Sequence, residues 1–160
     1  MTAPEILLID DDRVWLQTLA EFLRDRGFRV WTAEGPRPGQ KLLEEHDVLV
    51  AVIDFDLPEM NGLELLRRMR RRHRNLFVLM LSGADDPGLA EEALAEGANA
   101  FLSKTMPPRR LLQALVQFLV AGSVLATLTR ILSGRGRGLL PAPEEVPPSL
   151  LTLLQKPSRN

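Results

Sequence analysis

The chain has 160 residues, and its 45% hydrophobic and 26% charged content is typical of a water-soluble domain with a full core. A formal net charge of −1 argues against an overall attraction to nucleic acid or to an acidic membrane surface. The absence of cysteine excludes disulfides and thiolate metal sites. Because the first residues also lack the basic and apolar regions of a secretory signal, we expect a cytoplasmic protein.

Five short apolar segments, each followed by a segment with helical periodicity, run through about the first 120 residues. The segments that predict strands are 6–9, 28–31, 48–53, 76–81 and 98–102. Residues 48–53 form an unbroken apolar run, the pattern of a strand buried on both faces of a parallel sheet. Strands that alternate with helices predict a flavodoxin-like, doubly wound α/β fold with a parallel sheet of order 2-1-3-4-5.

The expected limits of the helices follow from capping and breaking residues. In the first helix, Asp12 is the expected N-cap, and Gly27 is the expected glycine just past the C-cap. Pro36 and Pro38, with the glycines beside them, predict a loop that delays the second helix to about residues 40–45. The next two helices are marked by apolar stripes at Leu63, Leu65, Leu66 and Met69, and at Ala90, Ala93 and Leu94 before Gly97.

The fifth helix is expected to begin at Pro107 and Pro108 and to run as far as about Leu132. We therefore assign residues 1–120 to one domain. Residues 121–160 are assigned to a helix extension, a flexible linker at 134–138 and a short tail, with no recognisable output domain.

A membrane span is disfavoured in this C-terminal part. Residues 111–129 carry no charge, but Gln113 and Gln117 interrupt the apolar run. The apolar segment 150–154 either folds back on the helix extension or leaves a surface for a second copy or a partner.

Reactive side chains follow four of the five expected strands. They are Asp10 with Asp11, Asp54, Ser82 and Lys104. Because the carboxyl ends of parallel strands meet at one edge of a sheet, we expect these groups to converge there. Clustered carboxylates favour a hard cation such as Mg²⁺, and Asp54 could then act as a nucleophile in phosphoryl transfer. The cation, the Lys104 ammonium and the Ser82 hydroxyl would each bind one phosphoryl oxygen.

Each of these residues also has an ordinary explanation when it is taken alone. An acidic pair before a helix usually caps it, a serine after a strand usually belongs to a turn, and a single lysine is usually a solvated charge. Their arrival at four strand ends in this order favours the joint functional interpretation.

Four motifs resemble the receiver domain of two-component response regulators: ILLIDDD (6–12), VIDFDLPEMNGLELL (52–66), VLMLSG (78–83) and GANAFLSK (97–104). The resemblance implies that Asp54 accepts phosphate from a histidine kinase or a phosphotransfer protein. The chain would then catalyse only its own phosphorylation and dephosphorylation. The resemblance also implies that Asp11 and Asp54 bind Mg²⁺ directly, with Asp10 acting through water and Asp56 through its backbone carbonyl.

The same resemblance implies a switch. Ser82 matches the hydroxyl that bonds the phosphate, Lys104 matches the lysine that pairs with it, and Phe101 matches an aromatic residue that turns inward. Phe101 is equally well explained as a plain core aromatic. The switch would alter the face of the fourth helix, fifth strand and fifth helix, which binds a downstream protein or a second copy.

Three positions depart from the family pattern. Thr105 stands where the family usually has a proline after the lysine, joined by a cis peptide, so either a strained or a trans bond is expected. The segment EGPRPGQ (34–40) replaces the usual loop before the second helix. Asp56 places an acid near the phosphoacceptor, where its side chain could tune the lifetime of the phosphate.

The run RRMRRRHR (67–74) is interpreted as the solvated outer side of the third helix. Glu64 and Arg68 are expected to pair at i, i+4, and no direct contact with nucleic acid is expected. The arginines assigned to this outer side are Arg67, Arg68, Arg70, Arg71 and Arg72.

Two alternative functions stay open at this point. Asp54 and Asp56 resemble the DxD motif of haloacid-dehalogenase-like, Mg²⁺-dependent phosphatases, although Leu57 and Pro58 depart from that motif and no cap domain is present. A degenerate receiver that serves as a scaffold and is never phosphorylated is supported only by Thr105.

Overall fold

The computed structural model describes residues 3–83 and 86–132, with side chains as far as residue 122. The described strands are β1 Glu5–Ile9, β2 Arg29–Ala33, β3 Val50–Asp54, β4 Phe77–Ser82 and β5 Ala100–Ser103. The helices that alternate with them are α1 Arg13–Arg24, α2 Pro36–Glu45, α3 Gly62–Arg72, α4 Pro87–Ala95 and α5 Pro108–Leu132.

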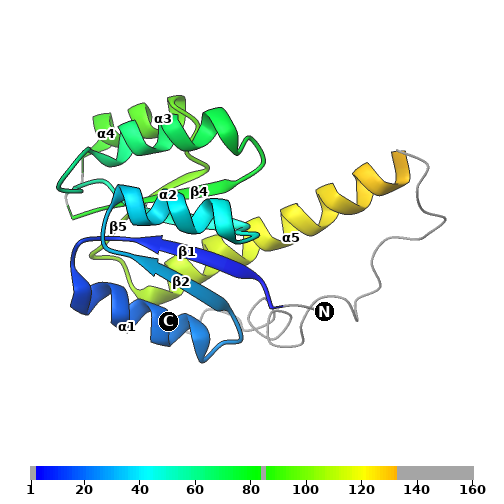
Figure 1. Cartoon of the computed structure of the whole chain (residues 1–160), viewed down its shortest axis with the longest axis horizontal. Coiled ribbons are helices and arrows are strands. Elements are labelled where there is room, and N and C mark those ends of the chain that lie inside the picture. The colour runs from blue at the N-terminus through cyan, green and yellow to red at the C-terminus, as the bar shows by residue number, and fades with distance from the viewer. Residues whose placement is uncertain (1–2, 84–85, 133–160) are drawn as a thin grey trace. The chain divides into compact units, whose positions relative to one another are not determined.

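The five strands form one parallel sheet in the order β2-β1-β3-β4-β5, which confirms the predicted fold (Figure 1). The pairing aligns Ile9 with Ile53, the residue before Asp54, and aligns Ser82 with Ser103, the residue before Lys104. The residues that follow these strands therefore emerge at one edge of the sheet, which is why side chains far apart in sequence can form a single site.

Helices cover the sheet on both sides, with α1 on one side and α3 and α4 on the other (Figure 1). Every residue of β3 is buried, as its unbroken apolar sequence predicts. The core includes buried residues from the strands and from α2, α3 and α4, among them Ile9, Leu43, Ile53, Leu66 and Ala93.

The prediction for the start of α2 was wrong by four residues. The helix begins at Pro36 with Gly35 as its N-cap, whereas a start near Gln40 was expected. A proline in the first turn is compatible with a helix, because the first N–H groups have no partner within it. Glycine suits position 39 of this helix because the backbone there passes close to β1, where an added Cβ would crowd the Ile9 side chain.

The end of α1 agrees with expectation, whereas one detail of α4 does not. Gly27 has a φ of +88°, its N–H donates to the Arg24 carbonyl at 2.9 Å, and the Phe28 N–H donates to the Leu23 carbonyl at 3.3 Å, as expected for a glycine just past a C-cap. Leu94 does not join the apolar stripe of α4, because its side chain is 50% exposed. Gly97 does follow the end of α4, with a φ of +106°.

The long α5 predicted from the sequence is confirmed, because the helix extends to Leu132. The chain divides into two compact units, Met1–Leu115 and Val116–Asn160, and all the candidate site residues belong to the first. The expected domain boundary at residue 120 stays a prediction. The predictions for the linker at 134–138 and the apolar segment 150–154 fall outside the described residues. Among the described helices, none combines the length and the hydropathy needed to cross a membrane.

Candidate functional site

Three carboxylates meet at the carboxyl ends of β1 and β3. Asp10, Asp11 and Asp54 each offer a carboxylate oxygen, and these oxygens lie within 4.8 Å of one another. Asp10 and Asp54 are buried, whereas Asp11 is exposed. We call these three carboxylates, together with Lys104, the acidic rim. The convergence expected from the strand ends is therefore present.

Short-range hydrogen bonds hold the first part of the rim. Asp10 Oδ1 accepts a hydrogen bond from the Asp12 backbone N–H at 2.9 Å. Asp12 Oδ1 in turn accepts from the backbone N–H groups of Val14 and Trp15, so Asp12 is the N-cap of α1, as predicted. The acidic run thus has two roles, because Asp10 faces the site while Asp12 starts the helix that follows it.

The backbone around Asp54 is held equally closely. The Asp56 N–H donates to Asp54 Oδ1 at 3.4 Å, and the Gly62 N–H donates to the Phe55 carbonyl at 2.8 Å. A Cβ at Gly62 would lie 2.7 Å from the Asp54 carbonyl oxygen and 2.9 Å from Phe55 Cα. Glycine is therefore required where α3 begins, because both neighbouring atoms are backbone and have little freedom to move.

Lys104 extends from the end of β5 to both buried carboxylates. Its Nζ lies 2.5 Å from Asp10 Oδ2 and 3.1 Å from Asp54 Oδ2. The described residues contain no cis peptide bond, so the Lys104–Thr105 bond is trans, and the alternative left open by the sequence is resolved. Ser103 Oγ accepts from the Thr105 N–H at 3.2 Å and lies 2.7 Å from Thr105 Oγ1, which holds this loop without a proline.

Burial and crowding set the charge state of Asp54. Burial, and then repulsion by Asp10, raise the pKa of Asp54 to about 6, although Lys104 and the Asp56 N–H act in the opposite direction. Burial disfavours the charged form of Lys104, but its contacts with Asp10 and Asp54 outweigh this and raise the pKa of the lysine. The rim thus brings together three carboxylates, of which two are buried, and one ammonium group that compensates only part of their charge.

The buried carboxylate of Asp10 depends on Lys104 for charge compensation. Its Oδ2 lies 2.5 Å from Lys104 Nζ, and the same ammonium group also lies 3.1 Å from Asp54. Three clustered carboxylates that share one ammonium group are suited to a hard cation that accepts oxygen ligands. A cation beside a nucleophilic carboxylate and an ammonium group is the arrangement that phosphoryl transfer requires.

Comparison with known proteins agrees with this geometry. The profile of the response regulator receiver domain matches residues 6–116. The chain belongs to this family. The transcriptional activator protein ExaE of Pseudomonas putida is 42% identical over 120 residues, which are 73% of this chain and 55% of ExaE. The cell cycle transcriptional regulator CtrA of Caulobacter vibrioides is 31% identical over 99 residues, which are 62% of this chain and 43% of CtrA.

The fold is shared with solved receiver domains. A CheY-like response regulator receiver domain protein from Methanospirillum hungatei superimposes with a TM-score of 0.71 at 28% identity, covering 75% of this chain and 96% of that one. The chain thus corresponds to nearly all of an isolated receiver domain but to about half of the curated relatives named above.

Ser82 and Phe101 of this receiver domain lie where the sequence placed them, at or near the ends of their strands. Ser82 is buried at the end of β4, and its carbonyl accepts from the Lys104 N–H at 2.8 Å. Phe101 is half-buried in β5 and packs against the core. These contacts are compatible with a core aromatic and with a switch residue, so the switch stays a prediction. Asp56 is exposed, and its proposed role as a carbonyl ligand also stays a prediction.

The arginine run belongs mainly to the outer surface of the receiver domain. The ion pair between Arg68 and Glu64 is confirmed at 2.6 Å. Arg67 pairs with Glu96 at 2.7 Å. These contacts agree with a solvated face, which we define as the arginine face, consisting of Arg67, Arg68, Arg71 and Arg72.

Arg70 was wrongly assigned to this outer side. Its guanidinium is partly buried and donates to the carbonyl oxygens of Leu76 and Gly97 and to Asn99 Oδ1. Burial lowers the pKa of this guanidinium. The side chain connects the end of α3 to the start of β4 and to the loop between α4 and β5. It therefore has a structural role that the charge pattern of the sequence does not indicate.

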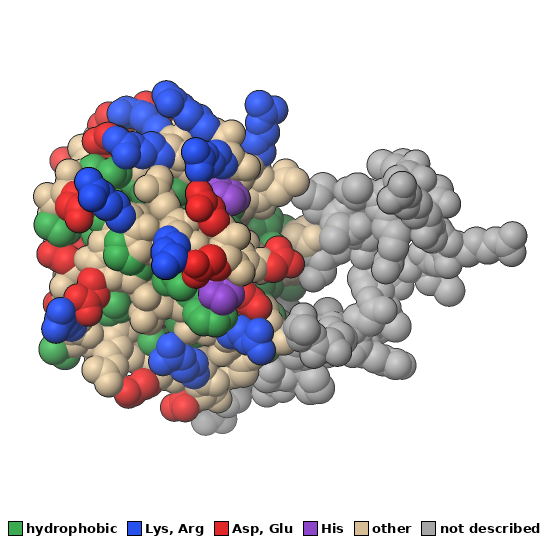
Figure 2. Space-filling view, in the orientation of Figure 1, with side chains coloured by type: hydrophobic (Ala, Val, Ile, Leu, Met, Phe, Trp, Pro, Cys, Tyr) green, Lys and Arg blue, Asp and Glu red, His purple; other side chains and the backbone are tan. Residues whose placement is uncertain are grey.

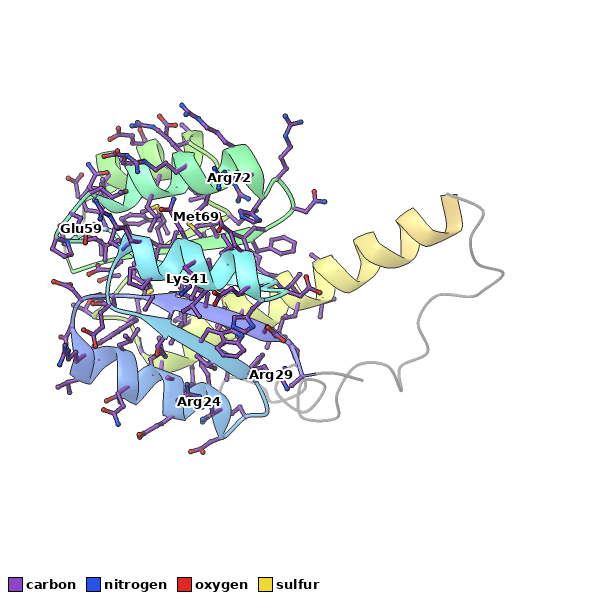
Figure 3. The ribbon with its side chains drawn as sticks, in the orientation of Figure 1. Arg24, Arg29, Lys41, Glu59, Met69 and Arg72 are labelled. Carbon is purple, nitrogen blue, oxygen red and sulfur yellow. The ribbon has the colours of Figure 1, made fainter. Side chains whose placement is uncertain are left out.

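The larger of the two described cavities lies away from the rim. It has a volume of about 480 Å³ and is lined by residues of α2 and α3, including Leu43, Glu44, Met69 and Arg72. Figure 3 labels Met69 and Arg72 on α3, and Arg72 pairs with Glu44 of α2 at 2.8 Å. None of the predicted site residues lines this cavity, so its size does not make it the reactive site.

Sequence reasoning missed one residue that contacts the rim. Lys104 Nζ lies 4.9 Å from the centre of the Trp15 ring, a distance at which an ammonium group interacts with an aromatic face. From the sequence, Trp15 was assigned only to the apolar stripe of α1. Its position one helical turn after the acidic run could have suggested that its side chain reaches the same edge of the sheet.

Proposed function

We propose that this receiver domain is a phosphorylation-gated switch of two-component signalling, and that Asp54 is its phosphoacceptor. The observation that carries the proposal is the arrangement of Lys104, which contacts both Asp10 and Asp54 beside a cluster of three carboxylates. A phosphoryl group on Asp54 would meet an ammonium group already in place. The donor would be the phosphohistidine of a histidine kinase or of a phosphotransfer protein.

The residues of the rim fit Mg²⁺. Asp10, Asp11 and Asp54 supply the oxygen ligands that Mg²⁺ requires, and the burial of two of these carboxylates beside a single ammonium group gives a further reason to expect a cation. We assign direct contacts to Asp11 and Asp54, a contact through water to Asp10 and a carbonyl contact to Asp56. When bound, Mg²⁺ would neutralise charge on the phosphoryl oxygens and keep Asp54 ionised near neutral pH.

In the reaction, a carboxylate oxygen of Asp54 forms a bond to phosphorus while the bond between phosphorus and the donor's imidazole nitrogen breaks. The electron pair of the broken bond stays on that nitrogen. Lys104 pairs with a phosphoryl oxygen, and the Ser82 hydroxyl donates to another. Hydrolysis of the phospho-aspartate restores the carboxylate, so the domain acts on its own phosphate rather than as an enzyme with a separate substrate.

The output would be a change in binding at α4, β5 and α5. Ser82 and Phe101 are the proposed links between the phosphate and this face, which a downstream protein or a second copy would bind. The ion pairs of the arginine face support a receiver that does not itself contact nucleic acid, and we expect the domain to act in the cytoplasm.

Labelling with acetyl phosphate and Mg²⁺ tests the proposal. Mass spectrometry of the wild type is expected to show one added phosphoryl group, and Asp54→Asn is expected to show none. Asp12→Asn is the matched control, because Asp12 is a neighbouring exposed acid and asparagine also caps helices. Label on Asp54→Asn, or loss of label in Asp12→Asn alone, would show that the acceptor has been assigned to the wrong residue.

The two alternatives from the sequence gain no support. The scaffold interpretation rested on Thr105, yet Lys104 contacts both carboxylates with Thr105 in place. The phosphatase interpretation requires the Asp56 side chain as an acid or base, and that side chain has no described contact with the rim. Multiple turnover of a phosphate ester, rather than a single labelling event, would favour the phosphatase.

A further inference from the structure

The ammonium group of Lys104 has three contacts with charged or aromatic groups in the described part of the chain. Two are the carboxylates of Asp10 and Asp54, at 2.5 and 3.1 Å, and the third is the Trp15 ring, 4.9 Å from Nζ to its centre. Phosphorylation would replace the charge on Asp54, and a bound cation would compete for Asp10. The Trp15 contact alone involves a group that the reaction leaves unchanged.

We propose that Trp15 is a positioning residue that keeps Lys104 directed at the rim while its carboxylate partners change. This inference rests on the proposed phosphorylation of Asp54. The face of an indole ring is electronegative and attracts an ammonium group, most strongly where water is excluded. Because the four-carbon stem of a lysine is flexible, a fixed aromatic surface reduces the number of orientations available to its charged end.

Local structure fixes the position of Trp15 relative to the rim. Trp15 is the third residue of α1, and its N–H donates to Asp12 Oδ1 at 3.0 Å. The Asp12 N–H donates to Asp10 Oδ1 at 2.9 Å. Two successive hydrogen bonds therefore connect the backbone of Trp15 to one of the carboxylates that Lys104 contacts. The Trp15 ring and the Asp10 carboxylate, which both contact Lys104, therefore belong to one hydrogen-bonded segment.

Apolar side chains surround the stem of Lys104. They include Trp15, Leu19, Leu102 and Leu111, which with Met106 line a hollow of about 80 Å³ beside the lysine. The Lys104 side chain is only 20% exposed. This partial burial reduces the access of water to the ammonium group, which raises the strength of a cation–π contact.

The chain contains its own matched control. Its only two tryptophans are Trp15 and Trp31. Trp31 belongs to β2, stacks on His46 with 3.5 Å between ring centres, and donates from Nε1 to Glu5 Oε2 at 2.9 Å. Replacing Trp31 removes the same side chain at a place where it contacts no residue of the rim.

The rate of labelling by acetyl phosphate and Mg²⁺ tests the role of Trp15. Trp15→Leu is expected to slow labelling by about three- to thirty-fold, as expected for loss of a partly desolvated cation–π contact. Trp15→Phe, which keeps an aromatic face, is expected to recover most of the rate, and Trp31→Leu to label at the wild-type rate. The Mg²⁺ dissociation constant from calorimetry should be the same in all four proteins, because the one described contact of Trp15 with a carboxylate is made to Asp12 by its backbone N–H, which every variant keeps.

A second readout needs no phosphate donor. The chain has three lysines, at positions 41, 104 and 156, so their side-chain methylene signals can be separated by NMR. The Lys104 signals are expected to be shifted upfield by the Trp15 ring, and this shift should disappear in Trp15→Leu and persist in Trp31→Leu. If Trp15→Leu labels at the wild-type rate, or if Trp15→Phe is as slow as Trp15→Leu, the positioning role is wrong.

The two readouts separate failure of this inference from failure of the proposed function. If the wild type takes no label while the NMR shift depends on Trp15, the contact is real but the proposed function falls, and the positioning role falls with it. If the wild type is labelled on Asp54 and the Lys104 signals do not change in Trp15→Leu, only the positioning role is overturned.

Discussion

The acidic rim and the arginine face differ in how their charges are buried and paired. At the rim, two like charges are buried side by side and share one lysine. On the arginine face, three of the cations lie within 2.6 to 2.8 Å of a glutamate from the same or a neighbouring helix. Figure 2 shows Lys and Arg side chains interspersed with Asp and Glu on the displayed face of the domain.

Charge density alone therefore does not identify a functional surface. Exposed pairs in water are screened and contribute little, so a run of arginines can be accommodated by solvent and by nearby acids. The buried carboxylates of the rim are screened less by solvent, and Lys104 compensates only part of their repulsion, so a further cation or a proton is expected to lower it. A ligand that binds at the rim is therefore expected to change the local electrostatic energy more than one that binds on the arginine face.

Arg70 is expected to give the largest change in stability, because it is the arginine of the run that is partly buried. Arg70→Met would remove the donor to the carbonyls of Leu76 and Gly97 and is expected to lower the free energy of unfolding by about 2 to 4 kcal/mol. Urea denaturation measures this change. A loss no larger than that of Arg72→Met would mean that the hydrogen bonds of Arg70 do not matter for stability.

Asp54→Asn is expected to stabilise the metal-free domain at pH 7.5 by about 1 to 3 kcal/mol. The raised pKa of Asp54 means that its ionised form is disfavoured in the folded state, and asparagine removes that charge. Saturating Mg²⁺ should stabilise the wild type more than Asp54→Asn, since the variant lacks one ligand. Thermal unfolding with EDTA or Mg²⁺ checks both statements, and a destabilised metal-free variant would contradict the electrostatic description of the rim.

The pH dependence of stability in the metal-free wild type and in Asp54→Asn tests whether the difference between them is electrostatic. Asp54 has a pKa of about 6 in the folded chain and an ordinary value of 3.8. Its contribution to stability is therefore fully present below about pH 4 and is lost as the pH rises through 6. The advantage of Asp54→Asn over the metal-free wild type should accordingly grow between pH 4 and 6 and stay constant above pH 7. An advantage independent of pH would show that the effect is not electrostatic.

The smallest effect is expected on the arginine face. Arg72→Ala removes an ion pair with Glu44 whose side chains are 74% and 56% exposed, so stability should change by less than about 0.5 kcal/mol. The rate of labelling on Asp54 should not change, because none of the described contacts connects this pair to the rim. A large loss of stability in Arg72→Ala that persists in 0.5 M NaCl, where exposed pairs are screened, would show that Arg72 stabilises the fold by more than an exposed ion pair.

Much of the fold could be predicted because its determinants are local. The apolar runs, the N-cap at Asp12 and the glycine after α4 depend on residues close in sequence, and the alternation of strands and helices limits the possible sheets. Identification of the rim residues followed from the same rule, since parallel strands bring their carboxyl ends to one edge. The positions of Asp10, Asp11, Asp54 and Lys104 at this edge could therefore be predicted from the sequence.

The sequence was sufficient to predict which residues lie at the carboxyl edge of the sheet, because the alternation of strands and helices and the last residues of the strands can be read along the chain. The packing of segments that are distant in sequence could be known only from the tertiary structure. It placed Trp15 beside Lys104, directed the Arg70 guanidinium to backbone carbonyl groups, and packed Gly39 of α2 against Ile9. These outcomes depend on contacts between segments that are distant in sequence, and such contacts override local preference when burial and hydrogen bonding favour them.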